Sequence, residues 1–565
     1  MYILGLSFYY HDSSACLIKD GQIIAAAEEE RFTRKKHDPA FPSLAISFCL
    51  KEAGIDINSV EYIVFYEKPF LKFERIIFSY FKNWPKGYMT FCKMLNLWLT
   101  KKLRIKKTIR KELAYKGKVF FIKHHEAHAS SSFFSSPFKE AAIVTMDGVG
   151  EWATTTICDG VENSITPLRE IEFPNSLGLF YSAFTYFLGF NVNDGEYKVM
   201  GLAPYGQPIY VDLIKKELIK ISSDGSYELN QKYFKFEYGD EMINRAKFER
   251  LFGIKKRDSK EEIDKTHKDI AASVQAITEE IILLICSEAR RLTKRNNVCL
   301  AGGLFLNCVV NSKILEKKIF DDVFVFPASG DSGGAVGAAL FMWYQILNNE
   351  RELKELKNVY WGPSFSNEYI ENYLKRIDIK YKKLSEENLV KEVASYLKNQ
   401  KIVGWFQGKM EFGPRALGNR SILADPGNRE NWPKINKLIK FREDFRPFAP
   451  AILEDRLNDF FYFHGYKSPF MLFVAKNKTD KMPAITHIDG SSRVQTVSQE
   501  ENKLFYNLIS EFDKMTGMPA LINTSFNLSD IPIVCTPQNA FQCFLKSGID
   551  VLVLGNHIIL KEGYK

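Results

Sequence analysis

Two histidines four residues apart are the first feature of this sequence that could do chemistry. His124 and His128 lie within Lys123–Ser130, directly after a short apolar run, Val119–Ile122, that is typical of a buried strand. If a helix begins there, both imidazoles stand on one face and can share a metal ion. The alternative is the N-terminus of a helix whose histidines only complete hydrogen bonds.

Two aspartates follow later apolar runs. Asp147 ends the run Ala141–Met146, and Asp331 lies in a glycine-rich turn after Val323–Phe326. Carboxylates at the carboxyl ends of strands lie where α/β folds place their chemistry. A ligand set of two imidazoles and two carboxylates binds iron(II), zinc or manganese more suitably than a set of thiolates does. Asp331 could instead only cap the next helix.

A further candidate lies near the N-terminus, where His11 and Asp12 follow the first apolar run. His11 could accept a proton because histidine titrates near neutral pH, although a lone histidine is more often a turn residue. The charge run 28–38 that follows is typical of solvated surface. Within it, Arg31 and Lys36 could still face a bound anion.

Glycines and arginines indicate two more binding regions. The Gly302-Gly303 pair follows a buried strand and lets backbone amides approach a nucleotide, to which Asn307 could add a hydrogen bond. Beyond residue 400, basic and polar residues recur within loops ordered by glycine and proline, and burying an unpaired arginine is costly. We therefore expect one anion pocket, although each arginine could instead form a salt bridge. The four segments are 407–423, 440–450, 493–497 and 523–527.

Residues 67–118 form an insertion in which bulky aromatic residues alternate with basic ones. Such a segment could dock on an anionic membrane surface or on a glycan or lipid-linked acceptor. We favour the simpler interpretation, an amphipathic helical insertion whose basic face is in water.

Composition limits the other classes of protein. The 565 residues allow two to four domains, and no apolar run of about eighteen residues indicates a membrane span. The N-terminus is typical of a strand and not of a signal peptide. Nine cysteines without a CxxC pair favour a reduced, cytoplasmic setting. A net charge of +9 is mild at this length and does not argue for nucleic acid.

Eight motifs in a fixed order, spread over the whole chain, carry a resemblance to a known family. They are HHEAHASS, MDGVGE, EYKVMGLAPYG, AGGLFLN, GDSGGAVGAA, FGPRALGNRSILADP, FRPFAPA and NTSFN. Together they resemble the O-carbamoyltransferases that tailor nodulation factors and antibiotics, the NodU/CmcH type. The resemblance implies an α/β fold: an actin-like ATPase (ASKHA) domain with a duplicated βββαβα unit over 1–355, then a YrdC-like α/β domain over 356–565.

The resemblance also implies a two-site reaction. Carbamoyl phosphate and ATP would form carbamoyl-adenylate in the C-terminal domain, and the N-terminal domain would transfer the carbamoyl group to an acceptor hydroxyl. ATP with magnesium would be a co-substrate, and the bound metal would be iron(II), with zinc or manganese as alternatives. By motif match, His11 would be the base with Asp12 beside it. The metal ligands would be His124, His128, Asp147 and Asp331. The phosphate-binding residues would be Arg415, Lys440, Arg446, Arg493, Ser525 and Asn527. Gly302, Gly303 and Asn307 would bind the nucleoside.

Other classes of protein remain as alternatives. A threonylcarbamoyl-type tRNA-modifying enzyme is disfavoured by the weak basicity and the domain order. A hydrogenase-maturation carbamoyltransferase would need acylphosphatase and CxxC zinc modules, which this sequence lacks. A non-catalytic nucleotide-binding scaffold is disfavoured by the intact histidine, aspartate and arginine positions. We expect neither nucleic acid nor stable membrane insertion, and we expect a homodimer from the frequency of that assembly.

Overall fold

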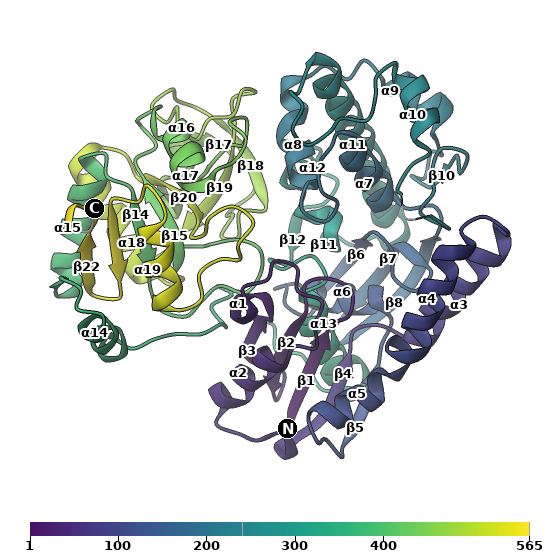
Figure 1. Cartoon of the computed structure of the whole chain (residues 1–565), viewed down its shortest axis with the longest axis horizontal. Helices are drawn as coiled ribbons and strands as arrows, with labels where there is room; N and C mark the ends of the chain where they lie inside the picture. Colours follow the sequence, from purple (N-terminus) through teal and green to yellow (C-terminus); the bar gives the residue numbers. More distant parts are fainter. Residues whose placement is uncertain (240, 564–565) are drawn as a thin grey trace. The chain divides into compact units, whose positions relative to one another are not determined.

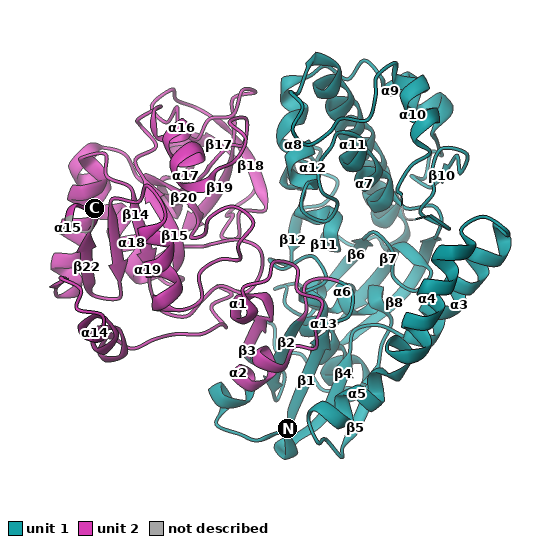
Figure 2. Cartoon of the chain, in the orientation of Figure 1, with its two compact units in different colours: residues 1–10, 14–24, 50–355 teal, residues 11–13, 25–49, 356–565 magenta. Residues whose placement is uncertain are grey.

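The computed structural model describes residues 1–239 and 241–563, which form two compact units (Figures 1 and 2). The first unit comprises residues 1–10, 14–24 and 50–355, and the second comprises residues 11–13, 25–49 and 356–565. The second unit therefore includes two short N-terminal segments in addition to the C-terminal part of the chain.

The first unit contains two five-stranded sheets with the same topology. In the first sheet, with strand order β3-β2-β1-β4-β5, β1 pairs antiparallel with β2 and parallel with β4, which pairs parallel with β5. In the second, β12-β11-β6-β7-β8, the strand β6 pairs antiparallel with β7 and parallel with β11, which pairs parallel with β12. The predicted duplicated βββαβα fold is thus confirmed. The first sheet has β1 (Tyr2–Ser7), β2 (Ser14–Lys19), β3 (Gln22–Glu28), β4 (Val60–Phe65) and β5 (Lys118–Phe121). The second has β6 (Glu140–Met146), β7 (Ala153–Val161), β8 (Ser164–Glu172), β11 (Asn297–Ala301) and β12 (Asp322–Val325).

Two helices that pack on each other, α6 (His124–Phe133) and α13 (Gly333–Phe341), follow the last strand of each sheet, β5 and β12, which lie at the sheet edges. A Cβ atom at Gly337 of α13 would lie 1.8 Å from the carbonyl oxygen of Ala127 in α6, so only glycine permits this approach. Likewise, a Cβ atom at Gly5 of β1 would lie 1.9 Å from the carbonyl oxygen of Ala335. These contacts fix the N-terminal ends of α6 and α13, where the predicted metal ligands lie.

The longest helix of the first unit is α11 (Lys265–Thr293). Its length and composition would allow it to cross a membrane, but 72% of its most apolar window is buried inside the structure, as in a core helix. The other helices of the first unit are α3 (Pro69–Lys82), α4 (Tyr88–Thr100), α5 (Ile105–Glu112), α7 (Leu177–Phe187), α8 (Glu196–Leu202), α9 (Val211–Glu217), α10 (Arg245–Phe252) and α12 (Cys308–Glu316). The N-terminal segment of the second unit contains α1 (Glu30–Thr33) and most of α2 (Ser43–Ala53).

The second unit is built on one mixed ten-stranded sheet, with the order β13-β22-β21-β14-β15-β20-β16-β19-β18-β17. Its strands are β13 (Lys382–Lys383), β14 (Val403–Phe406), β15 (Arg420–Ala424), β16 (Ala449–Leu453), β17 (Phe461–Tyr462), β18 (Phe473–Asn477), β19 (Ser491–Val497), β20 (Ala520–Ser525), β21 (Val551–Leu554) and β22 (His557–Leu560). Its larger helices are α14 (Asn367–Arg376), α15 (Glu386–Lys398), α18 (Lys503–Thr516) and α19 (Pro537–Leu545). Helices α15 and α18 pack on each other, and one hydrophobic core runs through the unit, so the predicted α/β class holds here too.

The charge run 28–38 is not the solvated surface that its composition suggests. Glu28, Glu29, Glu30 and Arg31 are all buried. Within the second unit, Arg31 donates to the carbonyl oxygen of Gly413 at 2.9 Å, and Glu28 accepts from the Gly413 amide at 2.7 Å. The charges are buried because opposite charges and backbone groups satisfy them, which composition alone does not reveal.

Candidate functional site

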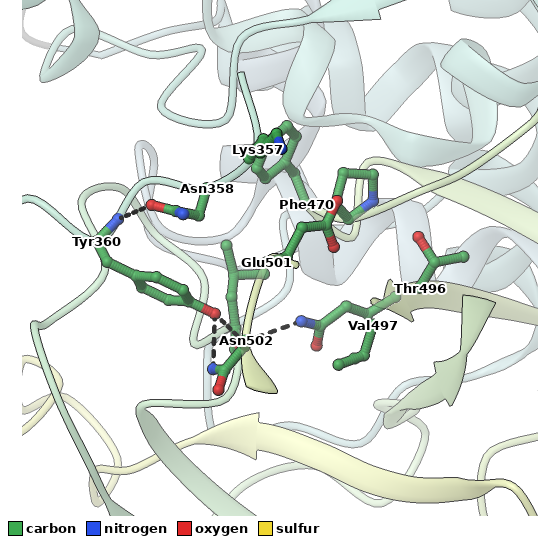
Figure 3. Close-up of a pocket in the computed structure, with 11 residues that line it drawn as sticks. Lys357, Asn358, Tyr360, Phe470, Thr496, Val497, Glu501 and Asn502 are labelled. Carbon is green, nitrogen blue, oxygen red and sulfur yellow. Dashed lines mark hydrogen bonds between the residues drawn. The ribbon is translucent and has the colours of Figure 1, made fainter. Parts of the chain in front are cut away.

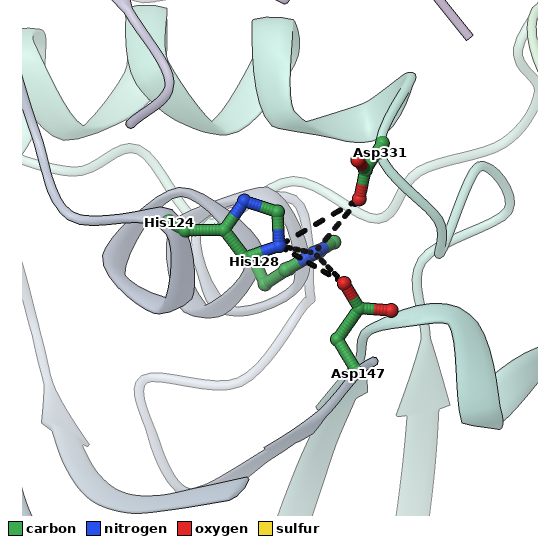
Figure 4. Close-up of side chains that lie close together, drawn as sticks. All are labelled: His124, His128, Asp147 and Asp331. Atoms are coloured by element: carbon green, nitrogen blue, oxygen red, sulfur yellow. Dashed lines mark hydrogen bonds and ion pairs between the residues drawn. The ribbon is translucent and has the colours of Figure 1, made fainter. Parts of the chain in front are cut away.

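The structure brings His124, His128, Asp147 and Asp331 together in the first unit (Figure 4). One ligand atom from each lies within 4.8 Å of the other three. Both histidines stand on the first turns of α6, Asp147 directly follows β6, and Asp331 lies in the loop between β12 and α13. The convergence follows from the topology, because the three segments emerge at the carboxyl ends of parallel strands.

The spacing of these atoms fits a shared transition-metal ion. The two Nε2 atoms lie 3.0 Å apart, His124 Nε2 lies 3.0 Å from Asp147 Oδ2, and Asp331 Oδ1 lies 3.6 and 3.7 Å from the two imidazoles. Donor atoms about 2.1 Å from one ion stand roughly 3.0 Å apart at right angles and roughly 3.4 Å apart at tetrahedral angles. The residues present therefore fit a metal site with two nitrogen and two oxygen ligands.

Charge pairing within the cluster shifts the titration of its members. Burial alone would lower the pKa of His128, but hydrogen bonds and charges from Asp147 and Asp331 raise it to about 9. Burial would raise the pKa of Asp147, but hydrogen bonds from His124 and His128 hold it well below its ordinary value. The two carboxylates thus favour positive charge between them, which is the charge that a divalent cation would supply.

Backbone groups around the cluster orient its members. The Gly303 amide donates to Asp147 Oδ1 at 3.1 Å, which leaves Oδ2 toward the imidazoles. Glu151 accepts from the His124 amide at 3.1 Å, at the N-terminus of α6. Such partners fix the direction of metal-binding side chains. The middle histidine, His125, faces Thr145 at 2.6 Å instead, and burial holds its pKa well below its ordinary value.

The predicted nucleoside residues have structural contacts of their own. Gly302 has a φ of 102°, and a Cβ atom there would lie 2.1 Å from the Met146 carbonyl oxygen. Asn307 caps α12 through the Val310 amide at 3.3 Å and exchanges hydrogen bonds with Gln275. The Gly303 amide is bonded to Asp147, as described above. Nucleotide binding by Gly302, Gly303 and Asn307 therefore stays a prediction.

Two buried cations beside this cluster were missed by the sequence interpretation. Lys72 and Arg75, on the inner face of α3, act electrostatically on Tyr10, as do Asp147 and Asp331. Lys72 pairs with Glu67 at 2.5 Å, whereas Arg75 Nη1 is buried without a hydrogen-bond partner among the described residues. Burial lowers the pKa of Arg75 to about 10. Lys72 and Arg75 are three residues apart, a spacing that places both on one face of a helix. This spacing could have indicated a shared role, but the sequence interpretation followed the aromatic residues around them instead.

His11 and Asp12 form a triad with a third residue, His37, within the second unit. Asp12 Oδ2 lies 2.8 Å from His11 Nδ1, and Asp12 Oδ1 lies 2.6 Å from His37 Nδ1. Burial would raise the pKa of Asp12, but these two hydrogen bonds hold it well below its ordinary value. An ionised carboxylate only accepts, so both Nδ1 atoms carry protons, and the role of His11 as a base stays a prediction.

In the second unit, Lys440, Ser525 and Asn527 are in direct contact. The Lys440 ammonium donates to the Ser525 carbonyl oxygen, to Ser525 Oγ at 3.2 Å and to Asn527 Oδ1 at 2.8 Å. All of its hydrogen-bond partners are neutral oxygens, and no carboxylate pairs with it in the described part of the chain. Burial, followed by the charges of Arg442 and Arg446, holds the pKa of Lys440 well below its ordinary value.

Strand register places Arg493 at the same end of the sheet as Ser525. Ala451 of β16 pairs with Gln495 of β19 on one side and with Leu521 of β20 on the other. Asn523 donates to Gln495 Oε1 at 2.7 Å, so these two side chains share one face of the sheet. Because side chains alternate along a strand, Arg493 and Ser525 project from that same face.

A loop that covers this face carries Arg415. The carbonyl oxygen of Leu417 accepts from Gln495 at 3.0 Å, and that of Ala416 accepts from Asn523 at 3.4 Å. Glu411, which the sequence interpretation missed, accepts from three backbone amides of the loop at 2.7–3.1 Å; they belong to Leu417, Asn419 and Arg420. The structure therefore gathers the predicted phosphate-binding residues around one end of one sheet face.

A pocket of the second unit lies beside β19 and is lined in part by Gln495 and Leu417 (Figure 3). Asn502 donates to the Tyr360 hydroxyl at 3.0 Å at its wall. Burial, together with the charge of Glu454, raises the pKa of Glu501 to about 7. None of the six predicted phosphate-binding residues lines this pocket.

Two family models match this chain, one in each part of the sequence. The family model described as Carbamoyltransferase N-terminus matches residues 2–340, and Carbamoyltransferase C-terminus matches residues 394–561. The chain belongs to the carbamoyltransferase family. This confirms the predicted enzyme class, a carbamoyltransferase, and the resemblance on which that prediction was based.

Two relatives of this carbamoyltransferase align over nearly its full length. An uncharacterized protein of Synechocystis sp., sll1178, is 46% identical over 99% of this chain and 97% of its own. The nodulation protein NolNO of Sinorhizobium fredii is 35% identical over 98% of this chain and 79% of its own. Among solved structures, component A of the Acidaminococcus fermentans (R)-2-hydroxyglutaryl-CoA dehydratase matches 61% of this chain and 99% of its own, with 15% identity and a TM-score of 0.35.

Proposed function

We propose that this carbamoyltransferase makes carbamoyl-adenylate from carbamoyl phosphate and ATP, and transfers its carbamoyl group to a hydroxyl of a small-molecule or glycan acceptor. The observation that carries the proposal is the buried Lys440 ammonium, which meets only neutral oxygens. A buried charge without a counter-charge is expensive, so an anionic ligand is expected beside it. Phosphate-bearing substrates meet that requirement.

In the second unit, the first half-reaction would use the residues around Lys440. Water cleaves carbamoyl phosphate to carbamate and phosphate, and a carbamate oxygen then attacks the α-phosphorus of ATP as pyrophosphate leaves. Lys440, Arg446 and Arg493 would offset phosphate charge, which is large in a site that excludes water. Ser525, Asn527 and Arg415 would orient the phosphate oxygens by hydrogen bonds.

The second half-reaction would use His11 as the general base. The acceptor hydroxyl attacks the carbonyl carbon, His11 Nε2 takes its proton, and AMP leaves with the electron pair of the broken C–O bond. Asp12 would hold the imidazole in the correct tautomer, and His37 would hold the second carboxylate oxygen, as a positioning residue. General-base help of this kind is worth ~10²–10⁴-fold in rate.

The residues His124, His128, Asp147 and Asp331 would hold a divalent metal, with iron(II) as the first choice and zinc or manganese as alternatives. When bound, such an ion would offset phosphate charge and orient the mixed anhydride. Arg75 would add a positive charge on the same side of the first unit.

Half-reaction assays of His11→Ala test the proposal. We expect the variant to form carbamoyl-adenylate and release pyrophosphate at the wild-type rate. Its rate of carbamoyl transfer to the acceptor should fall by ~10²–10⁴-fold. His37→Gln should reduce transfer less and leave pyrophosphate release unchanged. Loss of both half-reactions in His11→Ala would contradict the base assignment, and no ATP-dependent pyrophosphate release by the wild type would contradict the whole reaction.

A further inference from the structure

Helix α3 turns two of its charged residues, Lys72 and Arg75, toward the protein and three of its phenylalanines toward water. Its buried residues Lys72, Arg75 and Ser79 follow the helical spacing and face inward, as does Pro69. The opposite stripe contains Phe70, Phe78 and Phe81, which are 70%, 58% and 66% exposed. This is the reverse of the amphipathic pattern that drives a helix onto a soluble core. The expected amphipathic pattern with a basic face in water is found in the neighbouring helix α5, which buries Ile105 and Ile109 and exposes Lys106 and Lys107.

The exposed apolar residues continue through the turn after α3 and along α4, the two helices at one edge of the first unit in Figure 1. Trp84, Tyr88 and Met89 are 57%, 54% and 74% exposed. Aromatic contacts tie the two helices together, with the Tyr80 and Phe91 rings 5.1 Å apart. We call this set the α3–α4 surface. It consists of Phe70, Phe78, Phe81, Trp84, Tyr88, Met89, Leu97 and Leu99.

Positive charge surrounds the α3–α4 surface. Residues 67–118 contain fifteen lysines and arginines against three glutamates, a net charge of +12. The whole chain carries +9, so all other residues together carry −3. Exposed basic side chains stand among and beside the apolar ones, including Lys82, Lys86, Lys93 and Lys101. Positive charge is thus concentrated on the same helical insertion that exposes the apolar residues.

We propose that the α3–α4 surface docks on an anionic membrane leaflet. Tryptophan and tyrosine favour the headgroup region, phenylalanine, leucine and methionine enter the acyl boundary, and lysines above them meet lipid phosphates. Exposed apolar patches of this kind mark interaction sites. A second copy of the chain fits this surface poorly, because two-fold pairing would place two strongly positive patches against each other. Docking is peripheral and is independent of the reaction proposed above.

The test is sedimentation of the full chain with vesicles. One set contains phosphatidylcholine with 30 mol% phosphatidylglycerol, and the other contains phosphatidylcholine alone. We expect binding to the anionic vesicles, weaker binding to the neutral ones, and release by high salt, which screens surface charge. If the wild type stays in the supernatant with anionic vesicles at low salt, the proposal is wrong.

Matched variants separate the two contributions. Trp84→Ser with Met89→Ser should lower vesicle affinity by about tenfold or more, since each removes a large apolar side chain from the membrane interface. Lys86→Gln with Lys93→Gln should lower it roughly fivefold per charge on anionic vesicles only. The control is Tyr466→Ser with Ile488→Ser, two residues of the second unit that are 84% and 62% exposed.

Two results would overturn the proposal even if the wild type binds. One is an equal loss in the control, which would mean that vesicles take up any exposed apolar side chain. The other is a concentration-dependent dimer without lipid that Trp84→Ser with Met89→Ser dissociates, which would assign this surface to a second copy. Unchanged thermal unfolding of each variant shows that its fold is intact.

Discussion

The two polar sites of this protein differ in how their charges are balanced. In the first unit, two imidazoles lie between two carboxylates, and charges of both signs are within 4 Å of each other. In the second unit, the Lys440 ammonium has four neutral oxygen contacts and two arginines whose charges act on it. The first arrangement suits a cation and the second suits an anion. One chain therefore contains two sites of opposite preference.

Removing a carboxylate from the first site should have a large effect on metal binding. We expect Asp331→Asn to weaken metal binding by about a hundredfold or more, because the buried imidazoles lose an anionic ligand partner. Metal content after anaerobic loading with iron(II), zinc or manganese, measured by mass spectrometry, checks this. Asp159→Asn is the matched control, since Asp159 pairs with Arg295 at 2.8 Å away from the cluster. Equal metal content in Asp331→Asn and wild type would contradict the assignment of this cluster as a metal site.

Removing the cation from the second site should affect a different step. Lys440→Met is expected to slow pyrophosphate release by ~10²–10³-fold, because a preorganised charge aimed at the phosphates is lost. Its metal content should equal that of the wild type. Lys434→Met, which removes a lysine paired at 3.5 Å with Asp550, is the control. A joint loss of metal and pyrophosphate release in Lys440→Met would mean that the two sites are not functionally separate.

The smallest expected effect is a difference in pH dependence. Lys440 has a lowered pKa in the free protein, and a bound anion would raise it, so phosphate binding should take up a proton. Affinity therefore falls as pH rises above the lowered pKa of Lys440, by at most about tenfold per pH unit. Arginine stays charged, so Lys440→Arg should lack this fall. Calorimetric titration of the wild type and of Lys440→Arg with inorganic phosphate at several pH values measures this difference. In the ratio of their two phosphate affinities, the titration of phosphate itself cancels.

Local sequence signals predicted much of the first site. His124 and His128 have helical spacing, and Asp147 and Asp331 each follow a buried strand, so chain-local geometry already limits where their side chains point. For the second site the sequence predicted an anion pocket from arginine-bearing loops, and the motif match named Lys440, Ser525 and Asn527. Glu411 was not predicted, because it accepts hydrogen bonds from backbone amides six to nine residues further along the chain, and such a contact has no sequence pattern.

The sequence by itself indicated the enzyme family, the duplicated α/β topology that this resemblance implies, and the segments that bear the polar residues, because motifs are properties of short stretches. Tertiary structure alone decided which charges are buried. Arg31 and Arg75 belong to runs that composition assigns to the surface, yet both are buried, while Phe70 and Trp84 are exposed. Burial depends on which distant groups can satisfy a charge, and only the folded chain brings those groups into contact.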